Sequence, residues 1–219
     1  MSQRLQMLGI VADRILRVPL DRTARVGIDG VDGAGKTMFA DELAQVLRAA
    51  DRPVIRASVD GFHRPKSERY RRGRGSPEGY FEDSYDYAAL KRVLLDPLGP
   101  GGTGRYRTVV FDHVKDLPVA APECAAAPAS ILVLDGIFLH RPELRDIWDV
   151  SIFLDVAFEV SVARCARRDG TSSDPEAAAN RRYVEGQMLY LRTCDPRVRA
   201  TLAIDNNDLA SRFILDTKD

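Results

Sequence analysis

A short glycine-rich segment constrains this chain more than any other feature of its sequence. Residues 30–37 read Gly-Val-Asp-Gly-Ala-Gly-Lys-Thr and match the pattern G-x-x-x-x-G-K-[ST]. An apolar run at residues 25–29 precedes the segment and predicts a buried strand, and apolar residues at helical spacing follow it through residue 48. Glycines between a strand and a helix let backbone N–H groups point into one concavity, to which the helix N-terminus adds positive potential. The segment therefore predicts a phosphate-binding loop and, with it, a site for a nucleoside triphosphate.

The loop residues have expected roles in binding the nucleotide. Lys36 is expected to reach the β- and γ-phosphates and Thr37 to place its hydroxyl on Mg²⁺, so ATP and Mg²⁺ are the predicted cofactors. The tetrapeptide Asn-Lys-x-Asp, typical of a GTPase, does not occur, and 219 residues are few for a motor-type ATPase. A compact small-molecule kinase is therefore the favoured class. The other nucleotide-binding candidates in the loop are Gly30, Asp32, Gly33, Ala34 and Gly35.

The remaining pattern alternates short apolar runs with amphipathic ones. Strands that alternate with helices predict a mostly parallel sheet with helices on both faces. We therefore expect the α/β class, in the three-layer α/β/α architecture of P-loop NTPases with a small helical lid, as a single domain over residues 1–219 with an N-terminal helical extension at residues 1–23. The further predicted strands are residues 53–59, 107–111, 131–134, 150–154 and 201–204, and the further predicted helices are residues 86–95, 156–168, 176–191 and 208–215.

Composition excludes several classes of function. Lys plus Arg is 32 and Asp plus Glu is 32, so the basic excess of a non-specific nucleic-acid binder is missing. No run approaches the roughly 20 apolar residues of a membrane span, and charged residues interrupt the first stretch, where a signal peptide needs an unbroken apolar run. The 3 cysteines are far apart and predict reduced thiols. We expect a cytoplasmic protein whose partner is a small-molecule substrate, not a nucleic acid or a membrane, and formation of a homo-oligomer stays open.

Asp60 follows the apolar run that predicts the second strand. Ligands bind at the carboxyl ends of parallel strands, so we expect Asp60 to lie beside the phosphate loop. Phosphoryl transfer needs a carboxylate that orients or deprotonates the acceptor hydroxyl. Asp60 is therefore the predicted catalytic base, and a polar residue that merely ends a strand and caps a turn is the alternative.

Arg164 and Arg168 are the predicted cations over the transferring phosphoryl group. They stand four positions apart in a predicted helix, so they share one face and can grip one phosphate chain together. A polar break follows, and then Arg181 and Arg182. We expect about residues 164–182 to form a lid that closes over the nucleotide and excludes water, with a solvated basic helix face as the alternative.

These motifs, taken in order, resemble the uridine kinase and phosphoribulokinase family of P-loop kinases over about residues 25–215. In uridine–cytidine kinases the second strand ends in Asp-x-Phe, whose aspartate is the catalytic base, and Asp60 matches it. Asp135 falls where the family has Glu-Gly-Ile, with the acid near Mg²⁺, and Asn206 lies in a segment similar to the turn near the adenine. The resemblance thus implies that Thr37 and Asp135 serve the metal and that Asn206 contacts the nucleotide.

The same resemblance implies where the acceptor binds. Residues 80–86, Tyr-Phe-Glu-Asp-Ser-Tyr-Asp, look like the aromatic and acidic stretch that shapes the nucleoside pocket, and residues 111–113, Phe-Asp-His, are similar to the family's Tyr-Asp-Phe segment beside the base. The implied activity is transfer of the γ-phosphate of ATP to a primary hydroxyl of a pyrimidine nucleoside, uridine or cytidine. The implied substrate contacts are Phe62, His63, Phe81, Asp83, Asp112 and His113.

The sequence departs from typical uridine kinases directly after Asp60. Those enzymes continue with Ser-Phe-Tyr, whereas this chain has Gly-Phe-His followed by Arg; Asp-Ser-Phe-His-Arg is closer to phosphoribulokinase, and Asp-Gly-Phe recurs in pantothenate kinase relatives. Residues 64–74 are strongly basic and predict either a solvated loop or an electrostatic funnel for a phosphorylated acceptor. A kinase of a phosphorylated sugar or of a pantothenate-like acceptor is therefore the alternative activity. A catalytically inactive ATP-binding regulator is the alternative from a different class.

Overall fold

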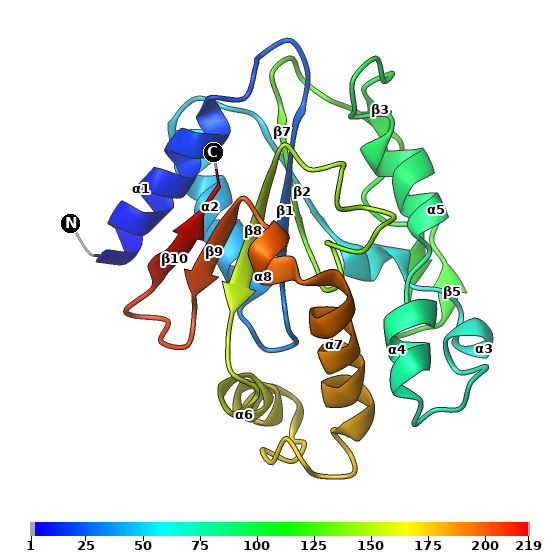
Figure 1. Cartoon of the computed structure of the whole chain (residues 1–219). Coiled ribbons are helices and arrows are strands. Elements are labelled where there is room, and N and C mark those ends of the chain that lie inside the picture. The colour runs from blue at the N-terminus through cyan, green and yellow to red at the C-terminus, as the bar shows by residue number, and fades with distance from the viewer. Residues whose placement is uncertain (1–2, 219) are drawn as a thin grey trace.

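The structure is a computed structural model and describes residues 3–218. Its central 6-stranded sheet contains β1 (Ala24–Gly30), β2 (Val54–Ser58), β7 (Ile131–Asp135), β8 (Val150–Asp155), β9 (Leu202–Asp205) and β10 (Phe213–Thr217). The strand order is β10-β9-β8-β1-β7-β2 (Figure 1). Every neighbouring pair is parallel except the edge pair of β9 and β10. The mostly parallel sheet is therefore confirmed.

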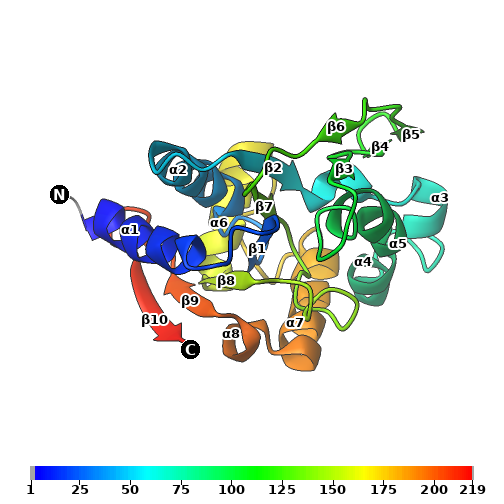
Figure 2. The same cartoon turned by 90° about the horizontal axis from the view of Figure 1, so that it is seen from above.

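Helices cover both faces of this sheet (Figure 2). One face carries α1 (Gln3–Leu16) and α2 (Lys36–Ala49), and the other carries α4 (Pro77–Asp83), α5 (Tyr87–Leu90) and α7 (Arg181–Cys194). In β7, Ile131 and Val133 join the first core and Leu132 and Leu134 the second, because alternate side chains of a strand point to opposite faces. These two cores confirm the three-layer α/β/α arrangement. The remaining helical segments are the 3₁₀ turn Val59–Phe62, α3 (Lys66–Arg69), the π-helical turn Lys91–Leu95, α6 (Phe158–Asp169) and α8 (Pro196–Arg199).

The N-terminal helix α1 is part of the layered core. Its buried side chains, Met7, Leu8, Val11, Ala12 and Ile15, pack in the same cluster as those of β1 and α2. The helical region predicted as an extension therefore packs against its own chain. None of the helices among the described residues is long and apolar enough to cross a membrane.

The last predicted helix, residues 208–215, is wrong. The Asp208 carboxylate accepts the backbone N–H of Ala210 at 2.9 Å and closes a turn, after which Phe213–Thr217 forms β10. The free edge of β9 supplies antiparallel hydrogen-bond partners there, and these are not visible in the local pattern.

The strand predicted at residues 107–111 is wrong as well. Only its last residue lies in a strand, in one of two small antiparallel pairs that join β3 (Arg105–Tyr106) to β6 (Cys124–Ala125) and β4 (Phe111–Asp112) to β5 (Leu117–Pro118).

The helix predicted over residues 176–191 begins later, at Arg181. The amide of Asn180 explains the delay, because its Nδ2 donates to the carbonyl oxygens of Ser172 at 2.9 Å and of Asp174 at 2.7 Å. These bonds hold a compact loop between α6 and α7. The basic stretch also holds α3, a short helix that the sequence did not predict.

Candidate active site

The glycine-rich segment forms a tight loop between β1 and α2. Gly33 and Gly35 have φ angles of 73° and 86°, in the left-handed region that favours glycine. A Cβ on Gly33 would lie 2.2 Å from the backbone carbonyl oxygen of Ser161 on α6, so no side chain fits there. Lys36 is the first residue of α2, whose N-terminus faces the loop. These features give the loop the backbone shape and the positive potential that phosphates need.

Lys36, Thr37 and Asp135 meet at the carboxyl ends of β1 and β7. The Lys36 ammonium donates to the carbonyl oxygen of Val31 at 2.8 Å, which keeps it inside the loop. The Thr37 hydroxyl donates to the buried Asp135 carboxylate at 2.8 Å, whose other oxygen accepts from Arg56 at 2.9 Å. The two residues that the resemblance assigns to the metal, Thr37 and Asp135, are thus in direct contact.

The Thr37–Asp135 pair supplies a hydroxyl and a carboxylate, two donor types that Mg²⁺ takes. Among residues 3–218 no group of three or more His, Cys, Asp and Glu side chains could hold a metal by itself. Mg²⁺ usually takes one or two carboxylates together with phosphate oxygens and water. The hydroxyl of Thr37 and the carboxylate of Asp135 fit that donor set.

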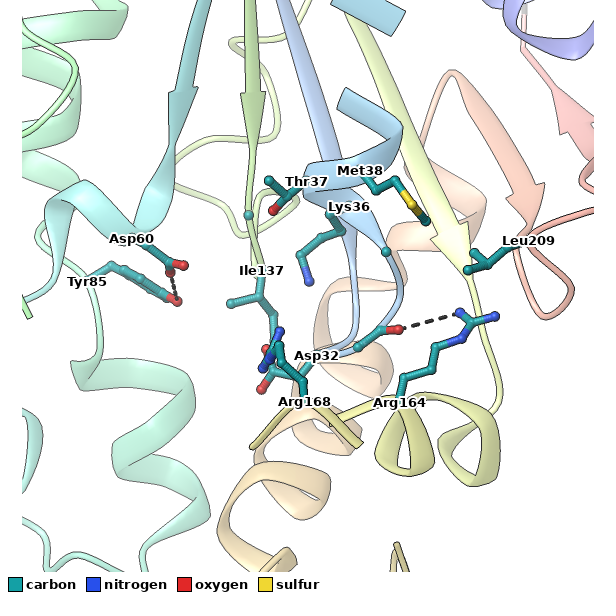
Figure 3. Close-up of a pocket in the computed structure, with 13 residues that line it drawn as sticks. Asp32, Lys36, Thr37, Met38, Asp60, Tyr85, Ile137, Arg164, Arg168 and Leu209 are labelled. Atoms are coloured by element: carbon teal, nitrogen blue, oxygen red, sulfur yellow. Dashed lines mark hydrogen bonds between the residues drawn. The ribbon is translucent and has the colours of Figure 1, made fainter. Parts of the chain in front are cut away.

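A pocket of about 390 Å³ lies in front of the loop (Figure 3). Lys36 and Thr37 line one wall, and Asp60 and Tyr85 line the wall across from them. The Tyr85 hydroxyl donates to Asp60 Oδ1 at 3.3 Å. Burial, followed by the Asp60 charge, raises the pKa of Tyr85 well above its usual value, so the hydroxyl remains a donor. Asp60 therefore lies at the strand end opposite the phosphate loop, as the sequence predicts.

Arg164 and Arg168 extend from α6 into the same pocket (Figure 3). Arg164 donates to the backbone carbonyl oxygens of Asn206 at 3.0 Å and Asn207 at 2.7 Å, and to that of Gly33 at 3.5 Å. Burial is the main cause that lowers the pKa of its guanidinium. Arg168 is held by its neighbour Asp169 at 2.8 Å. Both arginines thus line the pocket, and their guanidinium groups are held by contacts within the chain.

Asn206 supports the loop from behind instead of lining the pocket. Its side chain is fully buried, and its Nδ2 donates to the carbonyl oxygen of Ala34 at 2.5 Å. The apolar side chains at that end of the pocket belong to Met38 and Leu209. Neither residue is predicted from the sequence, and Leu209 lies in the segment that was predicted as a helix.

Asp32 connects the phosphate loop to the helices of the opposite face. Its backbone N–H donates to Gln187 Oε1 at 2.7 Å, and its carboxylate accepts from the Tyr80 hydroxyl at 2.5 Å. Burial and then the Asp32 charge raise the pKa of Tyr80 well above its usual value. Since Tyr80 lies on α4 and Gln187 on α7, one loop residue is tied to both helices.

A second pocket, of about 340 Å³, adjoins the first and shares Asp32, Asp60 and Tyr85 with it. We call it the acceptor-side pocket. Two of the predicted substrate residues, His63 and His113, line it with their rings stacked at 4.5 Å. His63 Nδ1–H donates to the carbonyl oxygen of Asp60 at 3.0 Å, because a carbonyl can only accept, and burial lowers the pKa of its imidazole. The other lining residues are Lys66, Arg69, Tyr70, Tyr80, Ser84, Arg182 and Tyr183.

Phe62 and Phe81 do not line either of these pockets. The side chain of Phe62 is fully buried in the second core and is unavailable to a substrate. Phe81 packs edge-on against Phe138, with ring centroids 5.3 Å apart, and under the Arg141 guanidinium at 4.6 Å. The motif correctly predicted aromatic residues near the site, but it could not indicate which of them are buried in the core.

Asp83 and Asp112 are also absent from both pockets. The buried Asp83 carboxylate pairs with Arg71 at 2.7 Å and Arg72 at 3.1 Å, so it anchors the basic stretch. Asp112 accepts the backbone N–H groups of residues 114 and 115 at 3.0 Å each and closes a turn between β4 and β5. The first of these aspartates is an ion-pair anchor and the second a turn residue.

Gly61, where typical uridine kinases have serine, is required by a close approach. A Cβ at this position would lie 2.8 Å from the carbonyl oxygen of Thr108. The backbone N–H of Val110 donates to the Gly61 carbonyl at 2.9 Å, which holds that segment against the 3₁₀ turn. The glycine at this position therefore allows the segment at residues 108–110 to pack closely against the 3₁₀ turn.

A phosphate loop, a Thr–Asp pair and a strand-end carboxylate that faces them across one pocket define the class of P-loop kinases. The model of the phosphoribulokinase/uridine kinase family matches residues 26–174. The chain belongs to this family.

Individual relatives are distant. The chain is 28% identical over 139 residues to a pantothenate kinase of Clavibacter michiganensis subsp. michiganensis, an alignment that covers 59% of this chain and 43% of the relative. It is 29% identical over 160 residues to a uridine kinase of Schizosaccharomyces pombe, covering 69% of this chain and 33% of the relative. The alignments thus span less than half the length of these two relatives.

Solved structures show the same fold at low identity. A protein described as a possible uridine kinase from Bacillus stearothermophilus superposes with a TM-score of 0.71 at 22% identity, covering 91% of this chain and 97% of the other. Phosphoribulokinase from Rhodobacter spheroides superposes with a TM-score of 0.59 at 15% identity, covering 84% of this chain and 70% of the other. At these identities the likeness shows the shared fold alone.

Proposed function

We propose that this chain is an ATP- and Mg²⁺-dependent kinase that transfers the γ-phosphoryl group to a primary hydroxyl of a small molecule. The observation that carries the proposal is the position of Asp60, which faces Lys36 and Thr37 across one pocket at the border with the acceptor-side pocket. A hydroxyl bound there can lie between the carboxylate and the γ-phosphate, as an in-line displacement requires.

In the proposed reaction the acceptor oxygen forms a bond to the γ-phosphorus while the bond from phosphorus to the ADP oxygen breaks. The acceptor proton passes to Asp60. Because the Tyr85 hydroxyl donates to Oδ1, Oδ2 is the atom left for that proton. Lys36, Arg164 and Arg168 stabilise the charge on the transferring group. Thr37 and Asp135 would hold Mg²⁺, which when bound neutralises charge on the phosphates.

We also propose that residues 164–182 act as the lid, in a single domain with the phosphate loop. The position of α6 supports this, because Arg164 and Arg168 extend from it into the pocket in front of the phosphate loop. A closed lid would exclude water and limit hydrolysis of ATP. A cytoplasmic location stays a prediction, in keeping with 3 free cysteines, and the oligomeric state stays open.

Two acceptor classes have support. Several relatives are named uridine kinase, which favours a pyrimidine nucleoside. The cationic lining of the acceptor-side pocket favours an acceptor that is already anionic, such as a phosphorylated sugar. A pantothenate-like acceptor carries a carboxylate and belongs with the second class.

The test is coupled ADP release with Mg-ATP against uridine, cytidine, pantothenate, ribulose 5-phosphate and a blank without acceptor. Acceleration by any one of these compounds above the blank supports the kinase. A flat panel, together with tight ATP binding, would contradict it in favour of the inactive ATP-binding regulator.

A further inference from the structure

We propose that Arg69 of α3 and Arg182 of α7, together with Lys66, form a subsite for an anionic group on the acceptor, of the size and charge of a phosphate monoester. The proposal rests on the kinase function proposed above, because it names the substrate class of the same site. The subsite occupies the wall of the acceptor-side pocket that these three side chains line.

The charge of the pocket is unbalanced at this wall. Its two carboxylates, Asp32 and Asp60, also line the pocket in front of the phosphate loop. Asp32 already accepts a hydrogen bond from the Tyr80 hydroxyl. The cationic side chains are Lys66, Arg69 and Arg182. An anion placed at this wall would be attracted by all of these groups.

Arg69 and Arg182 are cationic side chains that lie buried, with few partners for their charge. Their residues are only 8% and 7% exposed. Arg69 reaches Asp116 at the long distance of 3.4 Å, and its buried Nε has no hydrogen-bond partner among the described residues. Arg182 forms no ion pair within residues 3–218 and donates only to the backbone carbonyls of Gly73 and Arg74, at 3.4 and 2.9 Å. Buried guanidinium groups are normally matched by a carboxylate or phosphate.

The other arginines of the basic stretch behave differently. Arg64 pairs with Glu68 at 3.3 Å, Arg71 pairs with Asp83 at 2.7 Å, and Arg72 pairs with Glu82. These side chains are at least one-third exposed, at 37%, 59% and 40%. The protein therefore pairs the outward-facing arginines of the stretch with its own carboxylates, whereas on the pocket-facing side Arg69 has only the ion pair with Asp116 and Lys66 forms no ion pair with another described residue. This pattern is that of a ligand site, not of a uniformly solvated loop.

An uncharged nucleoside fits this wall poorly. Arg182 lies over the rings of Tyr70 and Tyr80, at 5.0 and 5.5 Å from their centroids. The other rings that line the pocket are those of His63, Tyr85, His113 and Tyr183. A base that stacked on Tyr70 or Tyr80 would have to displace Arg182, and the guanidinium would gain no counter-charge. A phosphate monoester instead accepts from the guanidinium groups and leaves the rings covered, and Arg offers the fork geometry that phosphate matches.

Binding of an anion can be measured without turnover. Inorganic phosphate is titrated calorimetrically into protein saturated with Mg²⁺ and a non-hydrolysable ATP analogue, so that the phosphate loop is already filled. We expect saturable binding that weakens at least tenfold in Arg69→Met and Arg182→Met and weakens less in Arg182→Lys, which keeps the charge but not the fork of donors. Arg71→Gln is the matched control from the same stretch, because it removes an arginine outside the pocket, and its affinity should equal that of the native chain.

Lys66→Met covers the case in which the buried variants fail to fold, because Lys66 is exposed and its loss leaves the core intact. Its phosphate affinity should fall at least threefold. Absence of saturable binding, or equal affinity in every variant, would overturn the subsite.

Turnover measurements distinguish a failure of the proposed subsite from a failure of the proposed kinase function. If a phosphorylated acceptor accelerates ADP release and its dephosphorylated form does not, and Arg182→Met raises the KM for it at least tenfold with unchanged affinity for ATP, both proposals stand. If uridine or cytidine accelerates ADP release with the same KM in Arg69→Met and Arg182→Met, the kinase stands and the anionic subsite falls. If phosphate binding depends on these arginines but no acceptor is turned over, the subsite stands and the kinase falls.

Discussion

Replacing Gly33 with alanine tests whether the phosphate loop has the shape that ATP binding needs. The Cβ of Gly33→Ala would lie 2.2 Å from the Ser161 carbonyl oxygen. Folded proteins essentially never show Cβ contacts shorter than 3.0 Å. The loop or α6 must therefore shift by about 1 Å, and a misplacement of that size at a reacting centre costs on the order of 100-fold in rate. The left-handed φ of 73° adds about 1–2 kcal/mol of backbone strain.

Gly104→Ala is the matched control for this strain. Gly104 has a φ of 71°, almost the same as Gly33, but nothing lies within 4 Å of a Cβ built there, and the residue is not among those that line the phosphate pocket. Both variants should lose similar thermal stability from strain. Only Gly33→Ala should weaken ATP binding, by at least tenfold in isothermal titration, which corresponds to about 1.4 kcal/mol. Equal ATP affinity in the two variants would refute the assignment of the loop as the phosphate site.

Three further changes test other parts of the site. Phe62→Ala should lower the free energy of unfolding by about 3–5 kcal/mol in urea denaturation, because the side chain is fully buried. Phe213→Ala, at a half-exposed position, should change it by less than about 1 kcal/mol. Similar losses in the two variants would show that Phe62 is not a core residue. Arg164→Ala should reduce kcat on the order of 100-fold while Arg167→Ala, on the same helix but outside the pocket, should not, and equal kcat values would remove Arg164 from the mechanism. Chelation of Mg²⁺ should abolish turnover, and Asp135→Asn should raise the Mg²⁺ concentration needed for half-maximal rate; an unchanged requirement would exclude Asp135 from the metal site.

Local signals account for the parts of the site that the sequence predicted. The glycines, Lys36 and Thr37 stand within one loop whose backbone conformation follows from the residues themselves, and Asp60 follows from the rule that parallel strands end at one edge of the sheet. The alternation of apolar runs likewise predicted five of the strands that build the sheet. At these positions the spacing of residues along the sequence is enough to predict their arrangement in space.

The acceptor side could be predicted only in outline. Arg69 and Arg182 are far apart in the sequence and meet because α4 packs against α7 and brings the basic stretch beside it (Figures 1 and 2). Phe62, Phe81 and Asp83 lie in the segments that the motifs identified, but whether a side chain faces a pocket or a core depends on contacts with residues such as Phe138 and Arg71. β10 is decided by the unpaired edge of β9, a tertiary feature that outweighs the helical spacing of residues 208–215.

The most direct test of the account is the acceptor-dependent turnover of Asp60→Asn, measured beside its affinity for Mg-ATP on the same preparation. Asparagine keeps the size of the side chain and its contact with the Tyr85 hydroxyl but cannot take a proton. The account predicts that kcat for acceptor-stimulated ADP release falls by about 10²–10⁴-fold while the ATP dissociation constant changes less than about twofold. An unchanged kcat would contradict the assignment of Asp60 as the base on which the proposed reaction depends.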